Sequence, residues 1–243
     1  VQHYKYWREY LEETYGFILI INRIIFAIAI ICLFFIWYPI IFPSSLEIIF
    51  LDVGQGDCTF VKLPEGKCFL IDGGMANEYY DTGKTVIIPF LKRYGIRKID
   101  GIFLTHADND HIGGLIEILK NVKVMAIYDG MDSDSKNRIY REFLYLAARK
   151  GINYYRLSEG NKLYFPEGVT FEVLNPSVPL ISSENHLNEN SLVLRILWKK
   201  ISILMTGDIE KKGEERVMLN SSESQILKVA HHGSNSGTSR EFL

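Results

Sequence analysis

Cysteine is scarce in this chain of 243 residues, which contains only Cys32, Cys58 and Cys68. None of the three stands in a Cys-x-x-Cys spacing, so the sequence lacks that signature of a metal or redox site. Cys58 and Cys68 flank a predicted hairpin, whose turn at residues 64–67 would pair Leu63 with Cys68 and leave Cys58 out of register. We therefore expect buried free thiols rather than a structural disulfide.

The chain also lacks an excess of charge of either sign, because 27 Lys and Arg against 29 Asp and Glu give a net charge of −2. It has no bulk electrostatic signature of nucleic-acid binding, so any DNA or RNA site has to be a local patch. One basic stretch is able to follow a phosphate backbone; it consists of Lys84, Lys92, Arg93, Arg97 and Lys98. The alternative, and the commoner outcome for such a run, is a solvated helix face.

Charge is absent altogether between Ile24 and Phe42, and only Asn22 and Arg23 interrupt the apolar run that begins at Phe17. About 20 apolar residues cross a hydrocarbon core roughly 30 Å thick. The run is longer than the apolar part of a signal peptide, about 7–15 residues, and too uniformly apolar for a buried helix. We predict a transmembrane helix over residues 17–43, preceded by a juxtamembrane segment over residues 1–16.

The cations beside this span are unevenly distributed, since Lys5, Arg8 and Arg23 precede its uncharged part, residues 24–42, and the next cation is Lys62. The positive-inside rule then places the N-terminus in the cytoplasm and everything after the span outside. The chain begins with Val1 rather than Met and stops at Leu243, directly after a cluster of candidate ligands. We therefore expect a fragment of a longer protein, truncated at its C-terminus.

Beyond residue 46, short apolar runs alternate with amphipathic stretches. Helices are predicted at residues 83–94, 112–120, 136–150 and 210–219, and strands at 46–51, 57–63, 67–71, 101–104, 122–128, 152–157, 162–165, 169–174, 191–198, 201–205 and 225–230. Strands in runs with interspersed helices predict two sheets covered by helices, an α/β layered sandwich.

Four candidate metal ligands, His106, Asp108, Asp110 and His111, fall within six residues directly after the apolar strand at 101–104. A strand that ends in a tight loop aims such side chains into one small space. Imidazole and carboxylate together suit zinc or manganese. The alternative is a polar surface turn that happens to contain histidine.

Three further polar clusters also follow apolar strands, at residues 52–57, 206–208 and 231–234. Strand ends on one edge of a sandwich converge, so these clusters are expected beside the first. Taken singly, Asp208 is more often a turn aspartate, and His231-His232 is compatible with a surface pair. Together with the loop at 106–111, they favour one composite site.

The motifs His-x-Asp-x-Asp-His-x-Gly-Gly at 106–114, Thr-Gly-Asp at 206–208 and His-His-Gly-Ser at 231–234 together resemble the metallo-β-lactamase superfamily. The segments Leu-Asp-Val-Gly-Gln-Gly-Asp at 51–57, Ile-Asp-Gly-Gly at 71–74 and Leu-Lys-Val-Ala-His-His-Gly-Ser at 227–234 resemble the C-terminal domain of the ComEC family of DNA-uptake membrane proteins more closely. The resemblance implies a metallo-β-lactamase-like αββα hydrolase domain over residues 46–243.

The resemblance also implies the roles of individual residues. The metal ligands would be His106 and Asp108 at a first site, Asp110 and His111 at a second, Asp208 at both, and His232 completing the second. Asp110 and His231 would act catalytically, with the roles of His231 and His232 exchangeable. Asp72 would orient a ligand histidine or else cap its loop. The loop at 52–57 would line the site or only be shaped by its polar residues, which are Asp52, Gln55 and Asp57. Further candidates for contact with the ligands or the substrate are Asn190 and Ser234. The superfamily pattern has histidine where Asp108 stands, and another in place of residues 188–190.

For function, the resemblance implies two divalent metal ions, zinc or manganese, and phosphodiester cleavage that degrades one DNA strand while the other enters the cell. The expected partners are DNA, the cell membrane, an upstream channel domain of the same protein and other competence proteins, with the hydrolase domain extracytoplasmic. One alternative is a membrane-tethered phosphodiesterase of another substrate, like the choline-phosphate esterases of wall polymers. Another is a degenerate domain that binds DNA or braces the channel.

Overall fold

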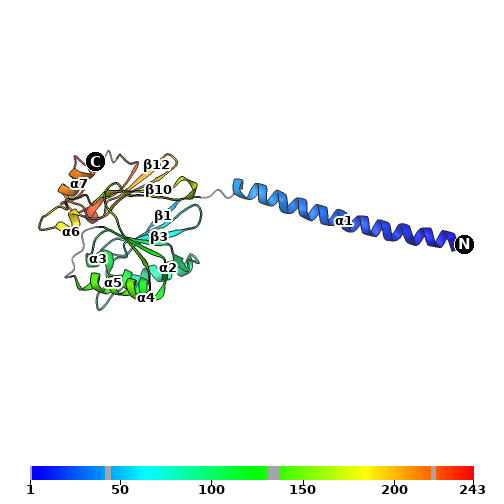
Figure 1. Ribbon diagram of the computed structural model, residues 1–243, viewed down its shortest axis with the longest axis horizontal. Coiled ribbons are helices and arrows are strands. Elements are labelled where there is room, and N and C mark those ends of the chain that lie inside the picture. The colour runs from blue at the N-terminus through cyan, green and yellow to red at the C-terminus, as the bar shows by residue number, and fades with distance from the viewer. Residues whose placement is uncertain (1, 42–44, 131–136, 220–222) are drawn as a thin grey trace. The chain divides into compact units, whose positions relative to one another are not determined.

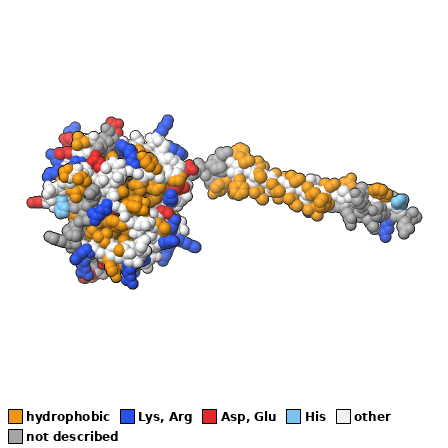
Figure 2. Space-filling model, viewed as in Figure 1, with side chains coloured by type: hydrophobic (Ala, Val, Ile, Leu, Met, Phe, Trp, Pro, Cys, Tyr) orange, Lys and Arg blue, Asp and Glu red, His pale blue; other side chains and the backbone are white. Residues whose placement is uncertain are grey.

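The computed structural model describes residues 2–41, 45–130, 137–219 and 223–243, in two units that divide after Ser45 (Figure 1). The first unit is helix α1 (Gln2–Ile41), which contains a 25-residue apolar segment, Thr14–Tyr38. At 1.5 Å per residue this segment is about 37 Å long, enough to span a membrane. Hydrophobic side chains cover most of its visible surface (Figure 2). The helix also takes in residues 2–16, and the end of the predicted span, residues 42–43, lies outside the described residues.

A six-stranded sheet forms the first half of the second unit, with the strand order β1-β2-β3-β5-β7-β8. Strands β1 to β3 are antiparallel, whereas β3, β5, β7 and β8 run parallel. The strands are β1 (Glu47–Phe50), β2 (Thr59–Lys62), β3 (Cys68–Ile71), β5 (Gly101–Leu104), β7 (Ala126–Asp129) and β8 (Asn153–Arg156). A separate pair, β4 (Lys98–Ile99) and β6 (Lys123–Val124), is also parallel.

The other half is a five-stranded sheet in the order β13-β12-β11-β10-β9, antiparallel except for the parallel pair β12 and β13. Its strands are β9 (Lys162–Tyr164), β10 (Thr170–Asn175), β11 (Val193–Trp198), β12 (Ile201–Met205) and β13 (Ile226–Lys228). The helical elements of the unit are η1 (Gly83–Ile87), α2 (Ile88–Arg93), α3 (Asn109–Ile112), α4 (Leu115–Asn121), α5 (Arg138–Arg149), η2 (Pro166–Gly168), α6 (His186–Glu189), α7 (Lys211–Met218) and η3 (Ala230–Gly233).

Alternating side chains of the strands divide the core into layers. Phe69 and Phe103 point between the sheets, where their ring centroids lie 5.6 and 5.4 Å from that of Phe171. Leu70 and Ile102, which are the sequence neighbours of these two phenylalanines, point to the opposite face of the sheet and pack beneath α2, α4 and α5. On the far side of the second sheet, α7 covers a smaller apolar cluster. The predicted αββα sandwich is therefore confirmed.

The structure differs from the predicted elements in where some of them end and in where a helix is interrupted. The helix expected at 112–120 is split into α3 and α4 by Gly113 and Gly114. A Cβ at Gly114 would lie 2.2 Å from the carbonyl oxygen of Gly73, so only glycine permits this close approach. The predicted hairpin pairs Lys62 rather than Leu63 with Cys68, and the described cysteines are free thiols as expected.

Asp129, at the end of β7, anchors α5 and β8 to the sheet through one buried carboxylate. Tyr140 donates to its Oδ2 at 2.6 Å, and Tyr154 donates to the same oxygen. Burial outweighs these hydrogen bonds and raises the pKa of Asp129 from 3.8 to about 6. The folded state therefore favours the protonated carboxyl. The protonated form contributes to the free energy of unfolding, and this contribution is lost as the pH rises through about 6.

We predict that Asp129→Asn becomes more stable relative to the unchanged chain as the pH rises from 4 to 7.5. The pKa difference corresponds to about 3 kcal/mol of unfolding free energy, which the uncharged amide would not lose. Urea unfolding of both chains in detergent at the two pH values measures this change. A stability difference that is the same at both pH values would contradict it.

Candidate metal centre

The candidate site lies where the ends of strands from both sheets meet. Asp72 follows β3, and His106 and His111 belong to the loop and short helix after β5. Asp208 follows β12, and the two histidines of η3 follow β13. These four loops therefore converge as their placement after apolar strands predicts.

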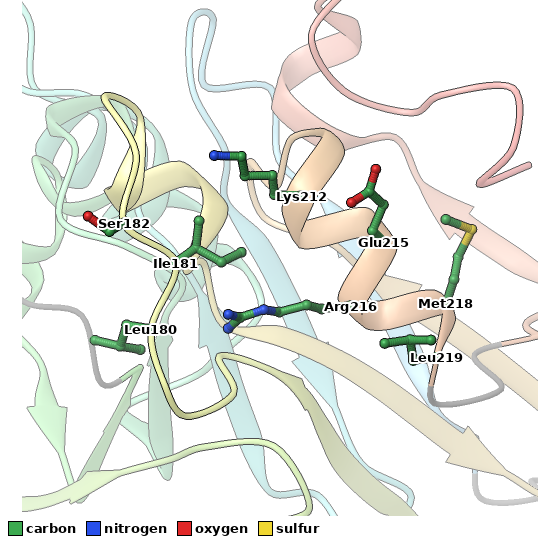
Figure 3. Close-up of a pocket in the computed structure, with 8 residues that line it drawn as sticks. All are labelled: Leu180, Ile181, Ser182, Lys212, Glu215, Arg216, Met218 and Leu219. Carbon is green, nitrogen blue, oxygen red and sulfur yellow. The ribbon is translucent and has the colours of Figure 1, made fainter.

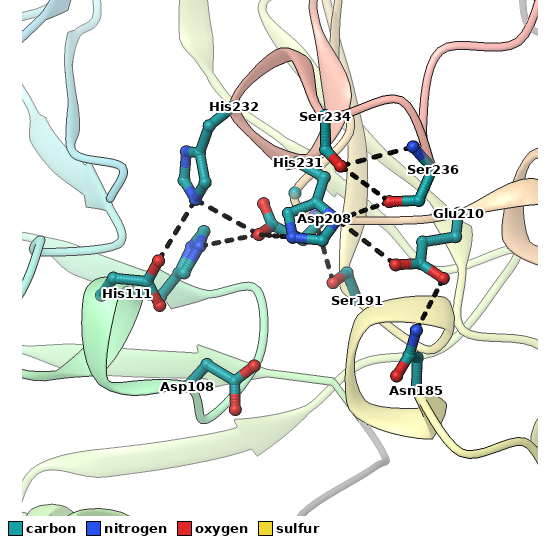
Figure 4. Close-up of polar contacts among 12 residues, drawn as sticks. Asp108, His111, Asn185, Ser191, Asp208, Glu210, His231, His232, Ser234 and Ser236 are labelled. Atoms are coloured by element: carbon teal, nitrogen blue, oxygen red, sulfur yellow. Dashed lines mark hydrogen bonds and ion pairs between the residues drawn. The ribbon is translucent and has the colours of Figure 1, made fainter. Parts of the chain in front are cut away.

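Four side chains form a group that is able to hold a metal ion: Asp57, His111, Asp208 and His232. Their ligand atoms all lie within 4.8 Å of one another. Asp208 Oδ2 lies 3.2 Å from Nε2 of His111 and 3.3 Å from Nε2 of His232. Figure 4 shows both rings directed at this carboxylate. Asp57 closes the group with Oδ1 at 3.4 Å from Nδ1 of His232.

The remaining predicted ligands surround this group. Asp110 Oδ2 lies 3.4 Å from Nε2 of His232. The ring of His106 lies 4.1 Å, between centroids, from that of His111, and its Nε2 lies 3.5 Å from Asp108 Oδ2. Asp108 is 44% exposed and stands apart from the other side chains in Figure 4. These distances place a second cluster, formed by His106 and Asp108, beside the first.

A buried network beneath the site fixes the orientation of His111. Asp72 Oδ2 lies 2.9 Å from Nδ1 of His111, which leaves Nε2 directed at Asp208. Asp72 also accepts hydrogen bonds from the backbone and the hydroxyl of Thr105 at 2.8 and 2.7 Å. A carboxylate behind a ligand histidine fixes its tautomer and raises its basicity. This geometry favours the orienting role for Asp72 over a loop cap.

Strained backbone conformations bring the last loops into the site. His231 and His232 have φ values of 48° and 53°, in the left-handed region that side chains with a Cβ rarely adopt. Such conformations cost about 1–3 kcal/mol each and persist where the surrounding structure imposes them. Gly56 has φ 113°, and a Cβ there would lie 2.1 Å from the Asp110 carbonyl oxygen. Asp57 N donates to that same oxygen at 3.1 Å, so the two loops are locked together.

Opposite charges at close range shift the pKa values of the site strongly. Burial opposes protonation of His111, but the carboxylates of Asp72 and Asp208 outweigh it and raise its pKa to about 10. Hydrogen bonds with Asp110, Asp208 and Asp57 raise the pKa of His232 to about 11.

The same contacts act in the opposite sense on the carboxylates. The His232 ring holds the pKa of Asp110 at about 2. Burial acts to raise the pKa of Asp208, but His111 and His232 hold it far below its ordinary range. The carboxylates of the site therefore stabilise bound protons on the two histidines, or another cation in their place.

The donor set fits a divalent metal ion. Nε2 of His106, Nε2 of His111 and Oδ1 of Asp208 are buried and make no hydrogen bond within the described part of the chain. Buried polar atoms without partners are uncommon, and a cation at the centre of the group would satisfy them. Nitrogen and carboxylate ligands suit zinc and manganese equally, so the donor types leave the metal's identity open.

Several predicted residues lie outside this group. Asp52 and Gln55 are exposed, and Asp52 accepts a hydrogen bond from the backbone of Gly54. The side chain of Asn190 is buried and binds the backbone of Ile181 through both its oxygen and its nitrogen, so it holds its own loop in place. Ser234 contacts the hydroxyl of Ser236 at 3.0 Å.

Two contacts of the site were not among the expected ones. Lys228, in β13, forms an ion pair with Asp57. Nδ1 of His231 lies 3.3 Å from Glu210 Oε1 and 3.0 Å from the hydroxyl of Ser236, while its Nε2 is 3.9 Å from Asp208 (Figure 4). The sequence contained a signal for both contacts, because Lys228 lies close before the histidine pair and Glu210 lies close after Thr-Gly-Asp. His232 is the member of the pair that joins the metal group.

A separate cavity of about 740 Å³ lies between α7 and the segment 180–182 (Figure 3). It is lined by Leu180, Met218 and Leu219 together with charged side chains of α7, and none of the candidate ligands contributes to it. Arg216 at its wall donates to Ser177. The cavity therefore takes no part in the metal centre.

The profile of the metallo-beta-lactamase superfamily matches residues 51–243. The chain therefore belongs to the metallo-beta-lactamase superfamily, whose fold is of hydrolase type and implies binding of divalent metal ions.

Three relatives that match most of this chain are named as competence or recombination proteins. ComE operon protein 3 of Bacillus subtilis is 36% identical over 222 residues, which cover 85% of this chain and 28% of the relative. Recombination protein 2 of Haemophilus influenzae is 28% identical over 91% of this chain and 26% of its own length. Competence protein ComA of Neisseria gonorrhoeae is 29% identical over 79% of this chain and 24% of its own length. The chain thus spans about a quarter of these relatives.

We predict that metal binding at pH 7 releases about two protons. The pKa values of about 10 and 11 keep His111 and His232 protonated at this pH, whereas a ligand imidazole has to be neutral. Apparent affinity should therefore rise with pH toward about 10. Calorimetric titration with manganese or zinc in buffers of different ionisation enthalpy counts the protons, and identical heats in all buffers would refute the prediction.

We further predict that Asp72→Asn lowers metal affinity by about 10–100-fold, because the amide no longer fixes the His111 tautomer. Metal content after dialysis against graded chelator measures this loss. Asp52→Asn, which removes an exposed carboxylate from a neighbouring loop, serves as the matched control. Equal metal retention by both variants would assign Asp72 to loop capping alone.

Proposed function

We propose that residues 46–243 form a metal-dependent phosphodiesterase that cleaves DNA during its uptake, acting on the strand that is not transported. The observation that carries the proposal is the convergence of Asp57, His111, Asp208 and His232 within 4.8 Å. The names of the competence relatives support the setting in DNA uptake.

The proposal has two divalent ions. Asp57, His111, Asp208 and His232 would hold one, with Asp110 beside His232, and His106 and Asp108 would take part in holding the other. Bound divalent ions would polarise a phosphoryl oxygen and make a nearby water more acidic.

The protein's own groups then complete the site. Asp110, ionised because of its contact with His232, is placed to accept a proton or a hydrogen bond from the attacking water. Nδ1 of His231 lies beside Glu210 and Ser236, and its Nε2 lies 3.9 Å from Asp208. In this proposal that Nε2, when it carries a proton, donates to a phosphate oxygen. A fixed donor aimed at developing negative charge lowers the barrier without reorganisation.

Helix α1 supports a location at the cell membrane. Lys5, Arg8 and Arg23 all precede the uncharged residues 24–42, and this excess favours an extracytoplasmic hydrolase domain, where incoming duplex DNA would arrive. In this proposal a channel domain of the same protein and other competence proteins are the partners that receive the surviving strand.

The detergent-solubilised chain is expected to cleave labelled single- or double-stranded DNA with manganese or zinc and to be inactive with chelator. The double variant Asp110→Ala His111→Ala should lose more than about 100-fold of this activity, because it removes a ligand and the candidate base together. Lys200→Gln, an exposed change on the β11–β12 turn, should leave the rate unchanged.

Two other results would redirect the proposal. Intact DNA with every metal, combined with hydrolysis of bis-p-nitrophenyl phosphate, would mean a phosphodiesterase of another substrate, such as a choline-phosphate ester. No activity on either substrate and no bound metal would favour a non-enzymatic role.

A further inference from the structure

A groove of about 510 Å³ lies between α2 and α4, in the helical layer that covers the six-stranded sheet. Its floor is apolar, formed by Ile88, Leu91 and other side chains packed on the core. Lys84, Lys92 and Arg97 line it and are exposed to solvent. Blue Lys and Arg side chains are visible along the part of the surface in Figure 2 that corresponds to this layer in Figure 1. The groove is thus concave, with cations beside an apolar floor.

The charge of this groove is unbalanced. Glu117 is the one acidic side chain among its described lining residues, and its Oε1 accepts a hydrogen bond from Asn121. None of the three lining cations forms an ion pair with a described residue. Exposed like charges held near one another repel, and a polyanion that bridges them is attracted to all of them at once.

The segment at one end of the groove is connected to the loops of the metal centre. Gly83, beside the lining residue Lys84, packs so closely on Gly114 that a Cβ on Gly83 would lie 2.1 Å from the Gly114 carbonyl oxygen. Gly114 N donates to Gly74 O, and Gly73 N donates to His111 O at 2.7 Å. The position of Lys84 is therefore fixed, through Gly83 and Gly114, relative to the loops that carry Asp72 and His111, and the groove continues from Lys84 along α2 toward Arg97.

The length of the groove matches several phosphates. Lys84, in the π-helical turn η1, and Lys92, in α2, are separated by about two helical turns, on the order of 10 Å. Within a duplex, one strand presents about three phosphates over that length, at about 3.4 Å of duplex axis each. A concave track accommodates a strand, whereas a flat bilayer surface would meet only its rim. These features favour a nucleic-acid strand over anionic lipid.

We infer that this groove binds the phosphate backbone of a DNA strand that extends away from the metal centre. The inference rests on the proposed nuclease function and specifies how the substrate is held outside the reacting phosphate. Backbone contacts of this kind position a strand without reading its sequence.

The test compares Lys92→Gln Arg97→Gln with Lys199→Gln Lys200→Gln, which removes the same charge from the turn between β11 and β12. Binding of labelled single-stranded DNA to each chain in detergent is measured over a range of salt concentrations, with chelator present to prevent cleavage. The groove variant should bind about tenfold more weakly at 50 mM salt, and its salt slope should fall by about 1.5. The control pair should bind like the unchanged chain.

Hydrolysis of bis-p-nitrophenyl phosphate with manganese separates this inference from the proposed function, because that substrate is too small to reach the groove. Unchanged hydrolysis with weakened DNA binding supports the inference. Equal DNA binding by the groove variant and the control overturns it, even if DNA is still cut. Weaker binding of the groove variant to phosphatidylglycerol vesicles with unchanged DNA binding also overturns it and makes the groove a lipid contact. If the unchanged chain hydrolyses the small substrate but neither binds nor cuts DNA, the proposed function and the inference fail together.

Discussion

The structure depends on holding several carboxylates close together at the metal centre, where they are largely buried. Asp72 and Asp208 are 1% and 3% exposed, and Asp57 and Asp110 each lie 3.4 Å from His232, which also contacts Asp208. Carboxylates this close repel one another and are poorly solvated, so the arrangement is favourable only with positive charge between them. His111 and His232 supply that charge as imidazolium, or become neutral ligands when a divalent ion supplies it instead. The metal centre is therefore a charge requirement of the fold as well as a candidate site of catalysis.

The backbone around the centre is shaped by this requirement. Both sheets contribute, because Asp57 and His111 follow strands of the first sheet and Asp208 and His232 follow strands of the second. Their loops approach more closely than ordinary side chains allow. Gly56 meets the carbonyl of Asp110, and Gly207, with φ 54°, packs so closely on Ser191 and Thr105 that a Cβ there would lie 2.9 and 3.0 Å from their Cβ atoms. The left-handed His231 and His232 belong to the same pattern of strained residues at the site. A fold that retains such strain does so because tight packing on both sides leaves no relaxed alternative.

Much of this arrangement was predictable from local sequence. Each polar cluster follows an apolar run, and parallel strands end at one edge, so the convergence of His111, Asp208 and His232 follows from pattern alone. The continuous apolar runs of β3 and β5 are typical of strands that are buried on both faces, and their alternate side chains do enter two different core clusters. What local pattern could not supply was the position of Asp57, since it depends on a hydrogen bond to Asp110, far along the chain. Asn190 shows the converse, because its segment matches a ligand position of the superfamily while its amide is directed at Ile181.

Net charge was uninformative here for a physical reason. A total of −2 does not show where acidic or basic groups gather along the chain. Residues 83–125 carry seven Lys and Arg against four Asp and Glu, and two of those acids, Asp108 and Asp110, belong to the metal loop. Negative charge concentrated at the strand ends attracts a cation, while positive charge along α2 attracts a polyanion. A phosphodiester polymer needs both, because its reacting phosphate binds best to metal ions and its flanking phosphates to lysine and arginine. The two opposite fields cancel in the sum while each remains strong where a substrate would meet it.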